Sequence, residues 1–193
     1  VIEPKSRMED SALYKAHPEL FGDANIYHQR TMCTSHPDTL RYLEEATRDI
    51  FRHVPKLGGL INISHGERWT SCLSHWSEVE GGIRRDVTCA CRGRQPCEIH
   101  CGTVGAMAKG MRSVNPKAEL ISWFYQPDAS VNRSDWVYDC AGCLPEGVKF
   151  LYNFESGLVV NQAGRWRVAG DYWLSLPGPG VPFKELAAHS AAA

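Results

Sequence analysis

Hydrophobic positions along the chain follow two alternating patterns, one typical of helices and one typical of strands. Apolar residues recur about every 3.6 positions between Pro37 and Pro55, which predicts an amphipathic helix bounded by the two prolines. Residues 97–114 predict a second helix, which three glycines weaken. Mostly apolar runs bounded by polar or breaker residues predict strands at 57–64, 118–126, 147–156 and 170–176.

Strands that are apolar on both faces and alternate with helices predict a parallel sheet covered by helices. We expect an α/β fold, a (β/α)8 TIM barrel of which this chain holds about strands 3 or 4 to 7. The strands near 57–64, 118–125, 148–154 and 170–175 are then parallel and adjacent in chain order. We expect residues 1–193 to form one partial catalytic barrel domain, which further segments of the same parent protein would complete.

Several predicted strands end in polar or aromatic residues, and the carboxyl ends of the strands form the active face of an α/β barrel. Glu67 follows the apolar run 57–64 and lies where such a barrel places a catalytic side chain. A glutamate in a solvated loop, or one that caps the following helix, produces the same pattern. Position alone leaves these two interpretations open.

Carboxylates at strand ends suit glycoside cleavage, which needs one acid and a second carboxyl group. Glu67 is the candidate general acid, because partial burial beside Trp69 would raise its pKa. Glu155 is the candidate second carboxylate, and Asp171 is the alternative. Glu155 also fits a strand-end carboxylate paired with an arginine.

Aromatic residues at the strand ends support a sugar site, because flat rings stack on the apolar faces of pyranoses. His65 is a candidate either to bond the sugar or to orient Glu67, although a lone histidine is more often structural. The aromatic candidates for substrate binding are Trp69, Trp123, Tyr125 and Tyr172.

The segment "MCTSHPDTLRYLEEATRDIFRHVPKLGGLINISHGE" resembles the region around the third and fourth strands of glycoside hydrolase family twenty, the β-N-acetylhexosaminidases. It is most similar to uncharacterised bacterial relatives of that group. Their pattern "CTS-P", "iS-sE--T-C", a paired-cysteine segment and "NP-A-vi-W" has counterparts here in that order. The counterparts are residues 33–37, 63–72, 89–91 and 115–123, within a match over roughly 17–180.

The resemblance implies carbohydrate metabolism and a glycosidase that cleaves a β-linked, N-acetylated hexosamine. It implies that Glu67 is the general acid, that Trp123 stacks on the sugar, and that Asp171 and Tyr172 form a polar pair. The chain departs from the family at Gly66, where the family has the aspartate that orients the substrate acetamide. This departure puts the substrate-assisted mechanism in question.

Eight cysteines are many for 193 residues, and six of them lie in two tight groups. The groups are "CACRGRQPCEIHC", from Cys89 to Cys101, and "DCAGC", which holds Cys140 and Cys143. Such spacings suit structural zinc, disulfides or free buried thiols. We expect the cysteine-rich segment 86–101 to be a loop and helix start within the domain, because it is too short for a core of its own.

Charge and hydropathy argue against a nucleic-acid partner and against a membrane span. The formal net charge is −1, and lysines and arginines are scattered, which argues against a nucleic-acid partner. No apolar run approaches the roughly 20 residues of a membrane span, and no signal peptide is apparent. A periplasmic or extracellular location is slightly favoured over the cytoplasm. A carbohydrate substrate is expected, and catalysis needs no cofactor.

Two rival functions remain open. The first is a carbohydrate- or protein-binding module that cysteine-ligated zinc or disulfides stabilise, which should unfold when a chelator removes the metal. The second is a hydrolase with a cysteine nucleophile, which ranks last because no cysteine lies in a recognisable nucleophile motif.

Overall fold

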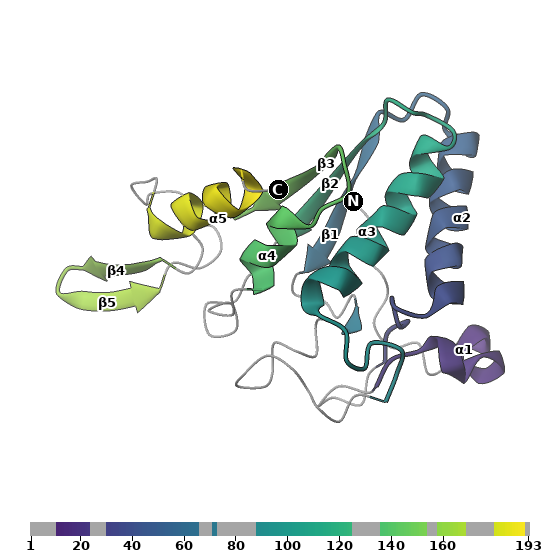
Figure 1. Ribbon diagram of the computed structural model, residues 1–193, viewed down its shortest axis with the longest axis horizontal. Helices are drawn as coiled ribbons and strands as arrows, with labels where there is room; N and C mark the ends of the chain where they lie inside the picture. The colour runs from purple at the N-terminus through teal and green to yellow at the C-terminus, as the bar shows by residue number, and fades with distance from the viewer. Residues whose placement is uncertain are drawn as a thin grey trace.

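The computed structural model describes most of the chain as an α/β domain built on a small parallel sheet (Figure 1). The described residues are 11–23, 30–65, 71–72, 88–124, 136–153, 158–168 and 180–191. Among them no helix is long and apolar enough to cross a membrane.

The main sheet has three parallel strands in chain order: β1 (Gly59–His65), β2 (Glu119–Phe124) and β3 (Val148–Tyr152). Leu120 of β2 pairs with Leu60 on one side and with Val148 on the other. The parallel order predicted for the first three strands is therefore confirmed.

Two long helices pack side by side against the sheet. They are α2 (Pro37–His53) and α3 (Pro96–Arg112), and both begin with proline, whose missing N–H costs nothing there. Both predicted helices are thus confirmed. Gln95 and Glu98 close the start of α3 with a capping box.

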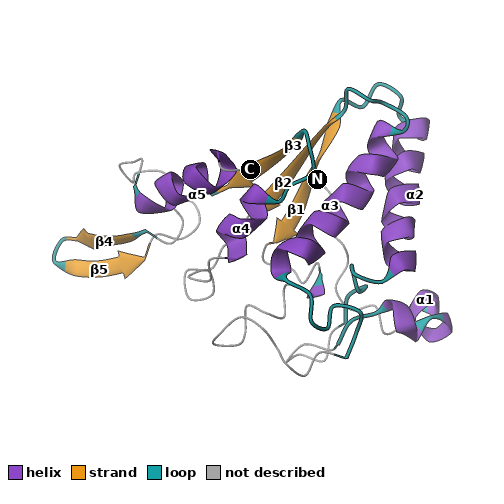
Figure 2. Cartoon of the chain, viewed as in Figure 1, coloured by secondary structure: helices purple, strands orange, loops and turns teal. Residues whose placement is uncertain are grey.

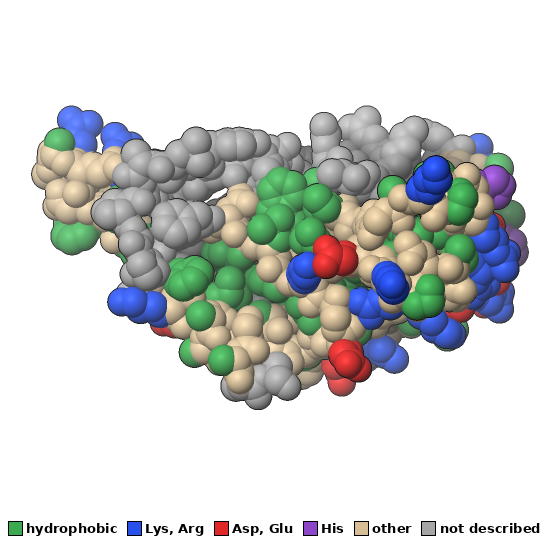
Figure 3. Space-filling model, turned by 90° about the horizontal axis from the view of Figure 1, so that it is seen from above, with side chains coloured by type: hydrophobic (Ala, Val, Ile, Leu, Met, Phe, Trp, Pro, Cys, Tyr) green, Lys and Arg blue, Asp and Glu red, His purple; other side chains and the backbone are tan. Residues whose placement is uncertain are grey.

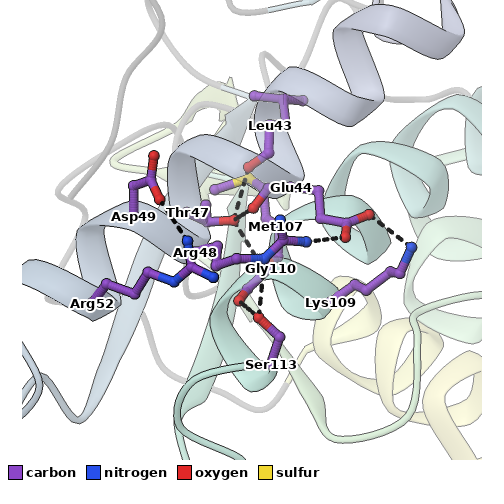
Figure 4. Close-up of polar contacts among 10 residues, drawn as sticks. All are labelled: Leu43, Glu44, Thr47, Arg48, Asp49, Arg52, Met107, Lys109, Gly110 and Ser113. Carbon is purple, nitrogen blue, oxygen red and sulfur yellow. Dashed lines mark hydrogen bonds and ion pairs between the residues drawn. The ribbon is translucent and has the colours of Figure 1, made fainter.

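The α2–α3 contact combines close backbone approach with polar pairing (Figure 4). The Thr47 hydroxyl donates to Met107 O at 3.2 Å, across the helix interface. A Cβ on Gly110 would overlap the Glu44 carbonyl, so this crossing requires glycine. Glu44 also pairs with Arg48 in its own helix and, at 2.8 Å, with Lys109 of α3.

Alternate residues of each strand face the helices. Leu120, Ser122 and Phe124 of β2 have no exposed surface, and Phe51 of α2 and Met111 of α3 are equally buried. Two apolar clusters result on this face. The one nearer the strand starts lies under α2 and α3, and the one nearer the strand ends involves α3 and α4 (Trp136–Gly142).

The opposite face of the sheet is less covered. Ile63, Trp123 and Leu151 are register partners across the three strands, and each keeps part of its surface exposed. Lys149 pairs with Glu119 at 2.6 Å, with both side chains exposed. Figure 3, which views the molecule from above the view of Figure 1, shows hydrophobic side chains gathered beside acidic and basic groups.

The C-terminal part adds a hairpin and a helix (Figure 2). Strands β4 (Val159–Gln162) and β5 (Arg165–Val168) are antiparallel, and Ala163 and Gly164 between them both have positive φ, as a type I′ turn requires. Helix α5 (Val181–Ala191) contacts α4. Near the N-terminus lie the short helices α1 (Ala12–Ala16) and η1 (Pro18–Leu20).

The expected (β/α)8 TIM barrel, whole or partial, is wrong. The described residues form a small mixed α/β domain in which the three-stranded sheet stays open and an antiparallel hairpin follows it. Strand and helix patterns alternate in the same way in an open parallel sheet and in a closed barrel. The sequence pattern therefore does not distinguish the two folds. The strand expected at 170–175 lies outside the described residues.

Candidate metal centre

Four cysteines from distant parts of the chain meet near the carboxyl end of the sheet. The Sγ atoms of Cys33, Cys72, Cys89 and Cys91 all lie within 4.8 Å of one another. Cys33 Sγ is 3.5 Å from Cys91 Sγ, and Cys72 Sγ is 3.8 Å from Cys89 Sγ. Cys89 keeps some exposed surface, and the other three are buried. Four convergent thiols of this kind can hold a metal ion.

Backbone hydrogen bonds fix Cys33 just before α2. Residues Phe21 and Met32 form an antiparallel bridge, and Cys33 N donates to Leu20 O at 2.7 Å. The Cys33 carbonyl then accepts from His36 N at 3.0 Å, where the chain turns into α2. The first thiol is thereby held between a bridge and a helix start.

Cys89 and Cys91 lie on a tight turn before α3. Arg92 N donates to Cys89 O and Arg94 N donates to Cys91 O, both at 3.0 Å. Thr88, just before the turn, bonds through its N–H to Asp23 Oδ2 at 2.9 Å. The turn is thus tied to the same N-terminal segment that carries Cys33.

Gly22 leaves room for the thiol of Cys72. A Cβ placed on Gly22 would lie 2.6 Å from Cys72 Sγ and 3.9 Å from Cys89 Sγ. The Gly22 N–H donates to Thr31 O at 2.9 Å, and its carbonyl accepts from Arg30 Nη1 at 2.8 Å. The absence of a side chain at Gly22 therefore permits the close approach of the Cys72 thiol.

The four thiols strongly shift one another's pKa values. Hydrogen bonds from Cys72, Cys89 and Cys91 hold the pKa of Cys33 far below its ordinary value. Hydrogen bonds within the group, with burial, raise the pKa of Cys72 well above it, and the contact with Cys33 raises the pKa of Cys91. For Cys89, Cys33 raises the pKa but Cys72 and Cys91 lower it, to about 7. The lowered pKa values of Cys33 and Cys89 favour negative charge in the group, which a bound cation would stabilise.

Hydroxyl groups accompany the thiols. Cys91 Sγ lies 3.2 Å from Ser35 Oγ, and Ser35 is 6% exposed. The hydroxyls of Thr31 and Thr34, on either side of Cys33 in sequence, are buried and have no hydrogen-bond partner among the described residues. Hydroxyls in this segment are donors suited to thiolate acceptors.

The other four cysteines form a second group where α3 meets α4. Cys101 and Cys143 are joined by a disulfide. Cys97 and Cys140 are free, and burial, followed by the nearby Cys97, raises the pKa of Cys140. Of the three states left open for the cysteines, the structure thus contains both disulfide-bonded and free forms.

Buried polar groups connect the sheet to α3. Ser122 Oγ lies 2.7 Å from Ser64 Oγ and 3.1 Å from His100 Nε2, and Asn62 Nδ2 donates to Ser64 Oγ at 2.7 Å. All four residues are less than a tenth exposed. These contacts satisfy polar groups that a core could not otherwise bury cheaply.

The structure places only part of the carbohydrate site predicted from sequence. His65 is the last residue of β1, and Trp123 is the fifth of six residues in β2, with its Nε1 donating to Asn153 Oδ1 at 3.0 Å. The remaining predicted residues lie outside the described part of the chain: Glu67, Trp69, Tyr125, Glu155, Asp171 and Tyr172.

Sequence spacing missed the composition of the four-thiol centre. It grouped Cys89 and Cys91 with Cys97, whereas the structure groups them with Cys33 and Cys72. The sequence signal that points to this centre is the pair Cys89 and Cys91. A tetrahedral metal site that uses both needs two more ligands from elsewhere in the chain. Comparisons with protein-family models, curated proteins and solved structures find no match for this chain, so the fold and the site stand on their own geometry.

Proposed function

We propose that Cys33, Cys72, Cys89 and Cys91 bind one Zn²⁺ ion that stabilises this α/β domain. The distances between the sulfur atoms carry the proposal. A tetrahedral site with Zn–S bonds of about 2.3 Å separates its sulfurs by about 3.8 Å. Two pairs in the group, Cys33–Cys91 and Cys72–Cys89, are 3.5 and 3.8 Å apart, and no pair exceeds 4.8 Å.

The ligand set favours zinc and a structural role. Thiolates are soft ligands, and four of them in a tetrahedral arrangement select zinc or iron. Four protein ligands leave no position for water or substrate, as in structural zinc sites. Burial of Cys33, Cys72 and Cys91 further limits access to the ion.

The ion would join parts of the chain that have little secondary structure of their own. It links the segment before α2 to residue 72 and to the turn before α3. Because ligand thiols must lose their protons, the metal supplies the positive charge that the thiolates need. Removing it leaves buried thiols close together and should loosen these segments.

The test measures the zinc content and the melting temperature of the chain while its Cys101–Cys143 disulfide is intact. We expect one zinc per chain, a thiolate-to-metal absorption band after cobalt substitution, and a lower melting temperature after chelation. Cys33→Ser should lose the ion, and Cys97→Ser, which changes a cysteine outside the group, should keep it. Retention of zinc by Cys33→Ser, or a wild-type chain that neither binds zinc nor responds to chelator, would refute the proposal.

A second candidate function is cleavage of β-linked, N-acetylated hexosamine glycans. One observation favours it: the carboxyl ends of β1, β2 and β3 are adjacent, and ligands of parallel α/β sheets bind at that edge. Trp123 and Asn153 meet there, and Glu67 follows β1 by two residues in sequence. In this function Glu67 is the general acid, and Glu155 or Asp171 supplies the second carboxylate.

Hydrolysis of chito-oligosaccharides by the wild-type chain and by Glu67→Gln tests this function. General acid catalysis contributes about 10²–10⁴-fold, so the variant should lose activity by that factor. Glu119→Gln is the matched control, because Glu119 is an exposed partner of Lys149 at the other end of the sheet. Binding without cleavage, unchanged in Glu67→Gln, would instead favour a carbohydrate-binding module.

A further inference from the structure

The second group of cysteines has the arrangement of two ligand pairs. Cys97 and Cys101 are four residues apart on α3, so they lie on the same face of that helix. Cys140 lies within α4, and Cys143 directly follows its last residue, Gly142. The spacings Cys-x3-Cys and Cys-x2-Cys both fall in the range that zinc sites use.

The two pairs are in contact. The Cys101–Cys143 disulfide joins them, with a Cα–Cα distance of 6.3 Å. Cys143 Sγ lies 3.4 Å from Cys97 O and 3.6 Å from Cys140 O. Cys140 has no exposed surface, and half-buried Cys97 packs against the same apolar cluster. A disulfide that only stabilises the fold needs two of these cysteines, and the structure gathers four.

We propose that Cys97, Cys101, Cys140 and Cys143 form a second site for Zn²⁺, which is open when the Cys101–Cys143 disulfide is reduced and closed when it is formed. The inference does not depend on the first site, since the two groups share no cysteine. It adds control by the Cys101–Cys143 disulfide, whereas the four cysteines of the first site are all free in this structure.

The chemistry balances with a dithiol as reductant. The dithiol gives two electrons and two protons, its own sulfurs become a disulfide, and Cys101 and Cys143 become thiols. Zinc then binds all four sulfurs as the four thiol protons leave to solvent. To accept the ion, the sulfurs of Cys101 and Cys143 must move apart to about 3.8 Å, the separation set by Zn–S bonds of about 2.3 Å.

The first measurement is zinc per full-length chain, with and without a phosphine reductant, after loosely bound metal is removed by a weak chelator. We expect one zinc in the disulfide-bonded chain and two after reduction. Re-oxidation should release the second ion. If the reduced chain still holds one zinc, the second site does not exist.

Two variants separate the sites. Cys97→Ser leaves the disulfide cysteines intact, so it should abolish only the zinc gained on reduction. Cys33→Ser should lose the ion of the first site in both redox states and still gain one on reduction. Two zinc ions in reduced Cys97→Ser would overturn the proposal, whereas failure of Cys33→Ser to lose zinc would overturn the first site alone.

Alkylation of the wild-type chain gives a readout that does not depend on variant folding. In the reduced chain, added zinc should slow labelling of Cys97 and Cys140 at least tenfold, and a strong chelator should restore it. In the disulfide-bonded chain, zinc should not change the labelling of these two residues. Equal labelling of the reduced chain with and without zinc would contradict the site.

Discussion

Cys72 Sγ packs so closely over Gly22 that a methyl group there would lie 2.6 Å from the sulfur. Gly22→Ala should therefore displace Cys72 from the four-thiol centre. We expect zinc affinity to fall by about tenfold or more, as when partners of metal ligands are changed. Competition with a colorimetric zinc chelator measures the loss.

Gly58→Ala is the control for this substitution. A Cβ on Gly58 meets nothing within 4 Å, so its zinc affinity should equal that of the wild type. If Gly22→Ala retains wild-type affinity, the thiols are not held as the structure places them. If both variants lose zinc, added side-chain bulk at Gly22 is not the cause.

Cys89 should be the most reactive thiol of the metal-free centre. Its pKa is lowered to about 7, and it is the one member of the group with exposed surface. Because the thiolate is the nucleophile, its alkylation rate should be low at pH 5, rise through pH 7 and level off above it. Cys72, buried and with a raised pKa, should react far more slowly throughout.

Labelling with iodoacetamide across pH 5 to 9, resolved by peptide mass spectrometry, measures these rates. Added zinc should suppress the reaction of Cys89 at every pH where the ion stays bound. Equal rates for Cys72 and Cys89 would mean that the centre does not persist without metal. A midpoint near pH 9 for Cys89 would mean that its neighbours do not stabilise the thiolate.

Local patterns predicted α2, α3 and the three parallel strands because each of these patterns reflects one buried face. The apolar spacing before Pro55 reports the side of α2 that packs on α3, and Phe51, near the end of that helix, has no exposed surface. The hairpin of β4 and β5 was missed because its strands are four residues long and mostly exposed. Trp166, for example, is 73% exposed and contributes no buried pattern.

Global features could not be predicted in the same way. Whether a parallel sheet closes depends on the number of strands and their tilt, neither of which one strand's sequence carries. Which cysteines meet depends on where the chain turns. Because α3 begins at Pro96, Cys97 lies in the helix, whereas Cys91 lies in the turn before it. Cys33 joins Cys91 across 58 residues, a separation that no spacing rule contains.

Trp123 should contribute to glycan binding if the carboxyl edge of the sheet is the binding site. Its side chain lies on the less covered face of β2, and its indole N–H is fixed by Asn153 at 3.0 Å. Trp123→Phe keeps an apolar ring but loses that hydrogen bond and part of the stacking surface. We expect chito-oligosaccharide affinity to fall roughly three- to tenfold, since such ring contacts are worth about 0.5–1.5 kcal/mol.

Calorimetric titration of chito-oligosaccharides into the chain measures this affinity. The matched control is Trp166→Phe, which makes the same change at an exposed position on β5. It should leave affinity unchanged. An equal loss in both variants, or none in Trp123→Phe, would place the glycan elsewhere or exclude it.

Two glycines of α3 should respond to alanine in opposite directions. A Cβ on Gly110 would overlap Glu44 O and the Thr47 hydroxyl of α2, so Gly110→Ala must push the helices apart. Overpacking of this kind costs about 1–3 kcal/mol, which exceeds the gain of about 1 kcal/mol in helix propensity. A Cβ on Gly102 meets nothing within 4 Å, so Gly102→Ala should gain up to about 1 kcal/mol. Urea unfolding measures both free energies, and a stabilised Gly110→Ala variant would show that α2 and α3 do not cross at Gly110.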